Sequence, residues 1–351
     1  MCPAGTSCDS GKCVVKCGDA QCGAGETCKN CLEDCGPCYV KIQPGGFWMG
    51  SPGAAQPCPT GYKGGGCAGD GSGVTTKEVG RQDNETLHYV QLTYSYQIQA
   101  TEVTQGEWKA VFSGWNPSLC ALCGDKCGVE QISWFDAAAY ANRRSQLAGL
   151  AGCFEFSEVW CKDSIGVEKD YLSCMTAAHK GIAAAKVALM PGLQNPYDCL
   201  GYRLPTEAEW ERAARAGASF AYNDGQESDA EHLLCEIPFH LTDIAWYCAD
   251  DLSVTAHKVG TKTPNAWALH DMSGGVNEWC WDSSTVEPSA YSPSTETTPD
   301  VNPVGPGGAT RVWRGGSWYD QAQACRSARR AAAAPNYRWG ALGLRLVRTV
   351  Q

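Results

Sequence analysis

Residues 311–348 read RVWRGGSWYDQAQACRSARRAAAAPNYRWGALGLRLVR and carry eight arginines, no lysine and one acid, although the whole chain has a formal net charge of -10. The run Gly315-Gly316-Ser317 predicts a tight turn, because glycine takes left-handed backbone angles readily. Leu342, Leu344 and Leu346 alternate with other residues and predict a strand. Aromatic and polar residues are mixed between the turn and the strand, and this mixture favours a recognition surface over a core. These residues are Trp318, Tyr319, Asp320, Tyr337, Arg338 and Trp339.

The composition predicts a loop-rich protein that works outside the cytoplasm. The 351 residues include 40 glycines, 18 prolines and 13 tryptophans, which favours many turns over a helical bundle. The 22 cysteines exceed what reducing compartments sustain as disulfides, so we expect a secreted or cell-surface protein. The acidic balance argues against nucleic-acid binding. The sequence has no apolar run of about 18 residues, so we expect no membrane span.

Residues 1–38 predict a small module held together by disulfides. They contain nine cysteines and few apolar residues, so burial alone cannot fold them. The spacings Cys28-x-x-Cys31 and Cys35-x-x-Cys38 also match a zinc knuckle, and nearby acids offer calcium ligands. We favour disulfides because the rest of the chain is also rich in cysteine. If Cys2 follows a removed lipoprotein signal, it would be acylated and anchor the protein to a lipid surface.

Residues 39–351 are predicted to form a larger α+β domain. The stretch 89–98 alternates between apolar and polar residues and predicts a strand. A short helix is expected at about 105–112. Ser133 is expected to cap a helix that continues to about residue 147, and Thr206 is expected to open another helix through a capping box.

Four separated motifs resemble the formylglycine-generating enzyme, or sulfatase-modifying factor, family. They occur in the order typical of that family and cover about residue 39 to the end of the chain. The resemblance implies a loop-rich α+β fold related to C-type lectins. The motifs are Ala100-TEVTQGE-Trp108, Gly201-YRLPTEAE-Trp210, Asn265-AWALHDMS-Gly274 followed by Glu278-Trp279, and the 311–348 stretch with RGGSW, CRSARR and LGLRLV.

The resemblance implies a copper site of which this chain keeps one half. In the family, two cysteines bind copper(I), and oxygen is activated to convert a substrate cysteine to formylglycine. Cys325 matches the second cysteine, whereas Asp320 stands at the position of the first. Copper(I) prefers soft thiolate ligands and a carboxylate is hard, so we expect copper only if the protein is catalytically active. Ser317 matches the family's active-site serine, with a turn serine as the alternative. The alternative for Cys325 is a disulfide or a buried thiol.

The resemblance also implies structural calcium, which takes oxygen ligands in flexible geometry. Asn265 opens the stretch that wraps one calcium ion in the family, and Asp250 matches a ligand of a second ion. Three departures from the family pattern lie nearby. Ala268 replaces a glycine, Gly275 replaces an asparagine, and Asn277 replaces a tryptophan.

Three functions remain open at this stage. We favour recognition of a protein or glycan ligand by a monomer, through the C-terminal surface. Some relatives of the family, the variable proteins of diversity-generating retroelements, diversify this segment, and the run Ala331–Ala334 fits such a surface better than a catalytic pocket. The second function is copper-dependent formylglycine formation, which activates sulfatases. The third is a structural role at the cell surface, in which the cysteine-rich residues 1–38 carry the function.

Overall fold

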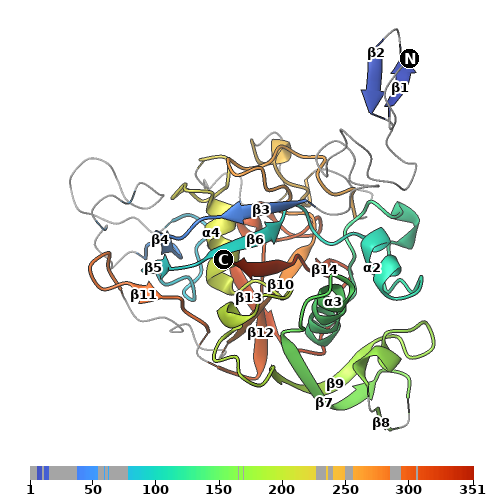
Figure 1. The fold of residues 1–351 in the computed structure, drawn as a ribbon. Coiled ribbons are helices and arrows are strands. Elements are labelled where there is room, and N and C mark those ends of the chain that lie inside the picture. Colours follow the sequence, from blue (N-terminus) through green and yellow to red (C-terminus); the bar gives the residue numbers. More distant parts are fainter. Residues whose placement is uncertain are drawn as a thin grey trace.

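The computed structural model describes most of residues 38–351 and two short strands before them. Strands β1 (Thr6–Asp9) and β2 (Lys12–Val15) pair antiparallel in a hairpin, which Figure 1 draws apart from the other strands. Cys38 takes part in a disulfide. The Cys2 anchor lies outside the described residues, and the boundary at residue 38 stays a prediction. The described residues are 6–9 and 12–15 (backbone only), 38–53, 59, 62, 78–164, 166–168, 170–226, 235, 240–249, 256–284, 294–305 and 307–351.

The C-terminal stretch contributes strands to two sheets. One sheet has the strand order β13-β12-β10-β14, and a second has the order β15-β6-β3. Two further sheets have the orders β11-β5-β4 and β8-β7-β9. In the order of the sheets above, the bounds are β13 Arg330–Ala333, β12 Thr310–Arg314, β10 Asn277–Ser284, β14 Leu342–Gly343, β15 Val347–Val350, β6 Ser95–Gln99, β3 Tyr39–Ile42, β11 Asp300–Val301, β5 His88–Leu92, β4 Gly45–Met49, β8 Val167–Glu168, β7 Phe154–Cys161 and β9 Ile182–Leu189.

Three α-helices lie in the described part of the chain, and each begins with a capping box. The predicted caps Ser133 and Thr206 are confirmed: each hydroxyl accepts the backbone amide three residues on, and the acid at that position bonds back to the cap. The helices are α2 Gln105–Val111, α3 Trp134–Leu147 and α4 Glu207–Arg215. The short 3-10 helices are η1 Ala121–Cys123, η2 Tyr171–Cys174, η3 Pro196–Asp198, η4 His240–Asp243 and η5 Ala322–Cys325.

Two strand predictions were wrong in their extent. The alternating stretch 89–98 is broken after Leu92, and its two halves, β5 and β6, join different sheets. Leu342, Leu344 and Leu346 are all fully buried, but residues 344–346 belong to no strand. The Leu344 carbonyl accepts the amide of Val103, which lies in a loop, and the intervening residues Gly343 and Arg345 are buried as well, so the alternation in sequence marks neither a half-buried face nor a continuous ladder.

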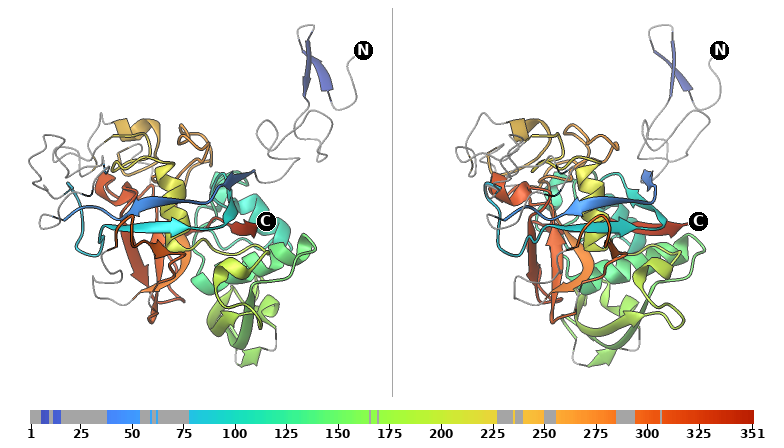
Figure 2. Two further views of the ribbon diagram at one scale, coloured as in Figure 1. Left: turned by 60° about the vertical axis from the view of Figure 1, so that its left-hand side comes forward. Right: turned by 90° about the vertical axis from the view of Figure 1, so that its left-hand side faces the viewer.

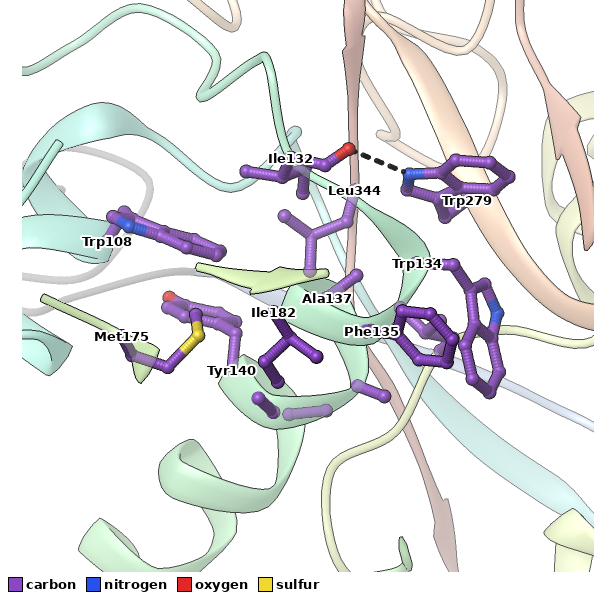
Figure 3. Close-up of a cluster of buried hydrophobic side chains, with 14 of the residues drawn as sticks. Trp108, Ile132, Trp134, Phe135, Ala137, Tyr140, Met175, Ile182, Trp279 and Leu344 are labelled. Atoms are coloured by element: carbon purple, nitrogen blue, oxygen red, sulfur yellow. Dashed lines mark hydrogen bonds between the residues drawn. The ribbon is translucent and has the colours of Figure 1, made fainter. Parts of the chain in front are cut away.

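A large aromatic core packs α2, α3 and β10 together (Figure 3). Trp108 of α2 stacks on Tyr140 of α3, with ring centroids 5.1 Å apart. Trp279 of β10 is fully buried, and its indole nitrogen donates to the Ile132 carbonyl at 3.1 Å. Burying rings of this size contributes most of the apolar area that stabilises such a loop-rich fold.

Strands β7, β8 and β9 form an arm that projects away from the β1–β2 hairpin in every view (Figure 2). The disulfides Cys153–Cys199 and Cys161–Cys174 hold this arm. Cys123–Cys127 and Cys235–Cys248 are also bonded. Among the described residues, none of the helices has both the length and the apolar character needed to cross a bilayer.

Candidate functional site

The chain bends at the Gly-Gly-Ser run, and the hydrogen-bonded turn follows it directly, from Ser317 to Asp320. Gly315 and Gly316 have φ angles of 102° and 71°, in the left-handed region that favours glycine. A Cβ on Gly316 would lie 2.7 Å from the Cys325 sulfur and 2.9 Å from the Ala324 carbonyl oxygen. The turn therefore brings the backbone after β12 directly against η5, and no larger residue fits at Gly316.

The turn places Asp320 in a hydrogen-bonded group. The Ser317 hydroxyl donates to Asp320 Oδ2 at 2.6 Å, and the Asn277 side-chain amide donates to the same oxygen at 2.8 Å. The Asp320 amide donates back to the Ser317 carbonyl at 2.9 Å. Ser317 is fully buried, so its hydroxyl serves this carboxylate within the turn.

These residues do not fit a copper(I) site. The family's two soft ligands are replaced by one sulfur and one hard carboxylate, and Asp320 Oδ2 already accepts two hydrogen bonds. Cys325 is fully buried, and its thiol points to the Gln321 carbonyl, with 3.9 Å between sulfur and oxygen. The alternative expectation of a buried thiol at Cys325 matches this position.

A cavity of about 220 Å³ opens beside Asp320. Trp313, Trp339 and Arg329 are among the residues that line it. Burial lowers the pKa of the Arg329 guanidinium, while the charges of Glu85 and Asp320 act in the opposite direction. The site therefore combines flat apolar walls with a partly exposed cation, a combination that suits ligand recognition. The lining residues are Asn277, Trp313, Arg314, Gly315, Gly316, Asp320, Ala324, Arg329, Arg330, Ala331 and Trp339.

The predicted aromatic residues form one surface next to this cavity. Tyr319 is 59% exposed and meets the rings of Trp318 and Trp339 edge-on, at centroid distances of 5.7 and 5.9 Å. Tyr337 is 42% exposed and stacks on Trp313 at 5.7 Å. We call Trp313, Tyr319, Asp320, Arg329, Tyr337 and Trp339 the C-terminal surface.

Arg338 faces away from this group. Its guanidinium forms an ion pair with Asp136 of α3 and donates to the carbonyls of Gln131 and Ile182. The side chain therefore fastens the C-terminal stretch to the arm, and its charge is compensated there.

Sequence reasoning missed Asn277, Trp313 and Arg329 as residues of the site. Asn277 begins β10, and its register places it beside Leu342 of β14, far from Asp320 in the sequence. A signal was present, because Asn277 departs from the family pattern at the same time as Asp320 does. A paired departure of two polar residues is the kind of pattern that points to a contact.

The arginine-rich stretch is largely buried and neutralised by acids from other elements. These buried ion pairs fix the backbone on both sides of the Gly-Gly-Ser turn, since each guanidinium satisfies groups from distant segments. The pairs are Arg314–Glu211, Arg326 with Glu78 and Glu85, Arg330–Glu207, and Arg345–Glu278.

Asn265 is fully engaged by protein groups. Its amide nitrogen donates to the carbonyls of Ala213 and Ala214 at the end of α4, and its oxygen accepts the amides of Trp267 and Leu269. This side chain does not fit a calcium ligand as it stands, because its oxygen, the atom that would bind the ion, already accepts the amides of Trp267 and Leu269. Asp250 lies outside the described residues, and calcium binding stays a prediction.

The family model for the sulfatase-modifying factor enzyme 1-like domain matches residues 26–350. The chaperone protein LppX of Paenibacillus barcinonensis is 28% identical over 254 residues, covering 71% of this chain and 76% of LppX. The formylglycine-generating enzyme of Streptomyces coelicolor is 38% identical over 157 residues, covering 41% of this chain and 46% of that enzyme. The solved structure of Treponema denticola variable protein 1 superposes with a TM-score of 0.60 and 26% identity, over 90% of this chain and 95% of that one.

The matched span begins inside the module predicted for residues 1–38 and runs to the last strand, β15. The predicted α+β fold is confirmed by this match and by the solved relative. The chain therefore belongs to the sulfatase-modifying factor enzyme 1-like family, to which formylglycine-generating enzymes are related.

Proposed function

We propose that this protein is an exported recognition module that binds a protein or glycan through the C-terminal surface and does not form formylglycine. The observation that carries the proposal is the hydrogen-bonded group of Ser317, Asn277 and Asp320. It occupies the position of the family's first copper ligand with a carboxylate that is held by two donors, so the metal chemistry has lost a ligand while the scaffold is intact.

The surface around this group has the composition of a binding site. Aromatic side chains and arginine are enriched where interfaces gain most of their energy, the aromatic rings because they bury a large area with few rotatable bonds and arginine because its planar guanidinium stacks and donates several hydrogen bonds. Tyr319 and Tyr337 are exposed, and Trp339 connects to Tyr319 through an edge-on contact. A ligand that covers these rings would also reach the Arg329 guanidinium in the cavity.

The main-chain pairing of strand β13 holds this part of the surface in place, whatever side chains the strand carries. Ala331 pairs with Trp313 and Ala333 with Arg311, so the ladder to β12 holds the strand in place. Side chains at such positions can change without disturbing the pairing, because the hydrogen bonds belong to the main chain. The likeness to Treponema denticola variable protein 1 supports a surface of this kind.

The disulfides support the proposed export. The described residues contain four complete disulfides, which form and persist in oxidising compartments. The two bonds of the β7–β9 arm close loops with sequence separations of 46 and 13 residues, so a reducing compartment would leave this arm without its covalent support.

The copper part of the proposal is tested by titrating the purified chain with copper(I) and assaying it on a Cys-x-Pro-x-Arg peptide. We expect no tight one-to-one complex and no oxidation of the peptide thiol. Tight uptake of one cuprous ion together with conversion of the peptide cysteine would establish the enzymatic function instead.

The binding part is tested by screening glycan arrays and displayed surface proteins, followed by variants. Tyr319→Ala and Tyr337→Ala should each weaken the selected complex by at least tenfold, in the range of central interface residues. Trp160→Ala is the matched control, since Trp160 is an exposed aromatic residue (45%) on β7 of the arm. Equal losses in all three variants would place the binding surface elsewhere.

A further inference from the structure

Three cysteines lie close together in the loop that follows α2. Cys123 and Cys127 form a disulfide whose Cα atoms are 6.0 Å apart. Cys120 is a partly exposed thiol, outside the disulfides of the described part of the chain. Cys120 therefore keeps its thiol and lies three residues before Cys123, the first cysteine of the disulfide.

The local backbone brings Cys120 next to Cys123. Residues 121–123 form the 3-10 helix η1, and the Cys123 amide donates to the Cys120 carbonyl at 3.1 Å. Side chains three residues apart on a 3-10 turn lie over one another, and such a turn holds the two Cα atoms within about 7 Å. Disulfides usually join Cα atoms about 4.4–6.8 Å apart, so Cys120 and Cys123 are spaced as a bondable pair.

A buried carboxyl group lies against Cys120. Glu130 is 0% exposed, and its Oε1 accepts the Cys120 amide at 2.8 Å. Its second oxygen, Oε2, is buried and has no partner of good hydrogen-bond geometry among the described residues, although the Leu119 backbone and the Ser118 side chain also act to lower the pKa of the group. Burial raises the pKa of this carboxyl to about 7, although the Cys120 amide acts in the opposite direction. The group can therefore take up and return a proton near neutral pH.

The rest of the loop is accessible and its far end is independently anchored. Leu119 and Leu122, on either side of Cys120, are 73% and 102% exposed. Cys127 is fully buried, but its amide donates to the Gly124 carbonyl and its carbonyl accepts the Gln105 amide. The Cys127 backbone therefore stays in place when its sulfur changes partner.

We propose that Cys120, Cys123 and Cys127 form a thiol–disulfide exchange site. The Cys120 thiol loses its proton to Glu130, and the thiolate attacks the Cys123 sulfur. The Cys120–Cys123 bond forms as the Cys123–Cys127 bond breaks, and Cys127 leaves as a thiolate that regains the proton. One disulfide and one thiol are present before and after, so the step needs no oxidant. Cys120, which is partly exposed, is also where a partner protein's disulfide would exchange.

The exchange borders the C-terminal surface. A Cβ on Gly340, next to Trp339, would lie 3.2 Å from Leu119 Cδ1 and 3.8 Å from Glu130 Oε2. A change of disulfide partner at Cys120 therefore alters the loop that packs against this part of the surface.

Trypsin separates the two disulfide forms, because Lys109, Lys126 and Arg143 bound the peptides 110–126 and 127–143. The native full chain is incubated with a glutathione redox buffer, quenched in acid, denatured and alkylated. The Cys123–Cys127 form gives two linked peptides with the label on Cys120. The Cys120–Cys123 form gives separate peptides with an internal disulfide in 110–126 and the label on Cys127. We expect both forms at equilibrium, and label confined to Cys120 would overturn the proposal.

Three variants test the proposal without relying on the equilibrium ratio. Cys127→Ser should form the Cys120–Cys123 disulfide in oxidised glutathione, and two alkylated thiols in peptide 110–126 would overturn the proposal. Cys120→Ser is the control, which should keep Cys123–Cys127 under all conditions. Glu130→Gln should approach equilibrium more slowly than the native chain at neutral pH, whereas an equal rate would remove Glu130 from the exchange site.

Discussion

The side-chain amide of Asn277 donates a 2.8 Å hydrogen bond to the carboxylate of Asp320, which also accepts the Ser317 hydroxyl. Both residues depart from the pattern of the family that the sequence resembles, which has tryptophan and cysteine there. A carboxylate at 320 needs a donor when it is taken partly out of water, and a small amide at 277 supplies one. The two replacements therefore form one structural unit.

The Asn277–Asp320 contact should appear as an energetic coupling. We expect a double-mutant cycle with Asn277→Ala and Asp320→Ala to give a coupling of about 1–2 kcal/mol, because the acceptor is charged. Urea unfolding of the four proteins measures it. Asn302 and Thr93 offer a control cycle, since their 2.8 Å hydrogen bond is exposed and should couple far less. Equal coupling in both cycles would contradict the idea of a unit at 277 and 320.

Glu278 is essential to the fold through Arg345. The bidentate pair is fully buried, with both bonds at 2.7 Å, and Trp210 also donates to Glu278 at 2.6 Å. Glu278→Gln removes the carboxylate that bonds directly to the buried guanidinium, so we expect a loss of about 3–5 kcal/mol in the free energy of unfolding.

The matched control for this loss is Glu158→Gln. Glu158 pairs with Lys186 across β7 and β9, but both side chains are more than half exposed. Exposed pairs contribute little, so its unfolding curve should overlay that of the native chain. A similar loss in both variants would show that burial does not decide the contribution of these pairs.

Asp282 should make stability fall as pH rises. Burial, and then the charge of Glu207, raise the pKa of this carboxyl to about 7, above the value of about 3.9 for an unfolded chain. The folded state therefore holds this proton more tightly than the unfolded chain does. The stability that this proton contributes is fully present below about pH 4 and is lost progressively as the pH rises to about 7.

The variant Asp282→Asn isolates this effect. Its stability relative to the native chain should improve between about pH 4.5 and about pH 8, by on the order of 2–4 kcal/mol. Denaturant unfolding at both pH values measures the difference. A difference that is independent of pH would mean that Asp282 is ionised throughout this range.

Ala268→Gly should stabilise the protein. Ala268 has a φ of 60°, a left-handed angle that strains a residue with a Cβ. Relief of this strain outweighs the greater flexibility of glycine in the unfolded chain, which leaves a gain of about 0.5–1 kcal/mol. Thermal unfolding checks it, with Ala148→Gly at the end of α3 as a control that should not be stabilised, since Ala148 has a φ of -89°.

Local signals in the sequence predicted the helix starts and the turn well. Ser133 and Thr206 cap their helices because the hydroxyl and the acid three residues later bond to each other's amides within one turn. Gly315 and Gly316 adopt the left-handed angles that the Gly-Gly pair predicted. Stretch 89–98 was harder, because alternation shows which residues are buried and does not show that the chain changes sheets after Leu92.

By itself, the sequence determined the family scaffold, the capped helices and the left-handed glycine pair, and it placed a carboxylate at residue 320. Each of these depends on residue type at fixed spacing along the chain. Only the tertiary structure decided that Asn277 holds Asp320, that Arg338 turns to Asp136, and that Glu278 compensates Arg345. These partners lie 43 to 202 residues apart in the sequence. They meet only when the strands and helices pack together, and no local sequence pattern encodes that packing.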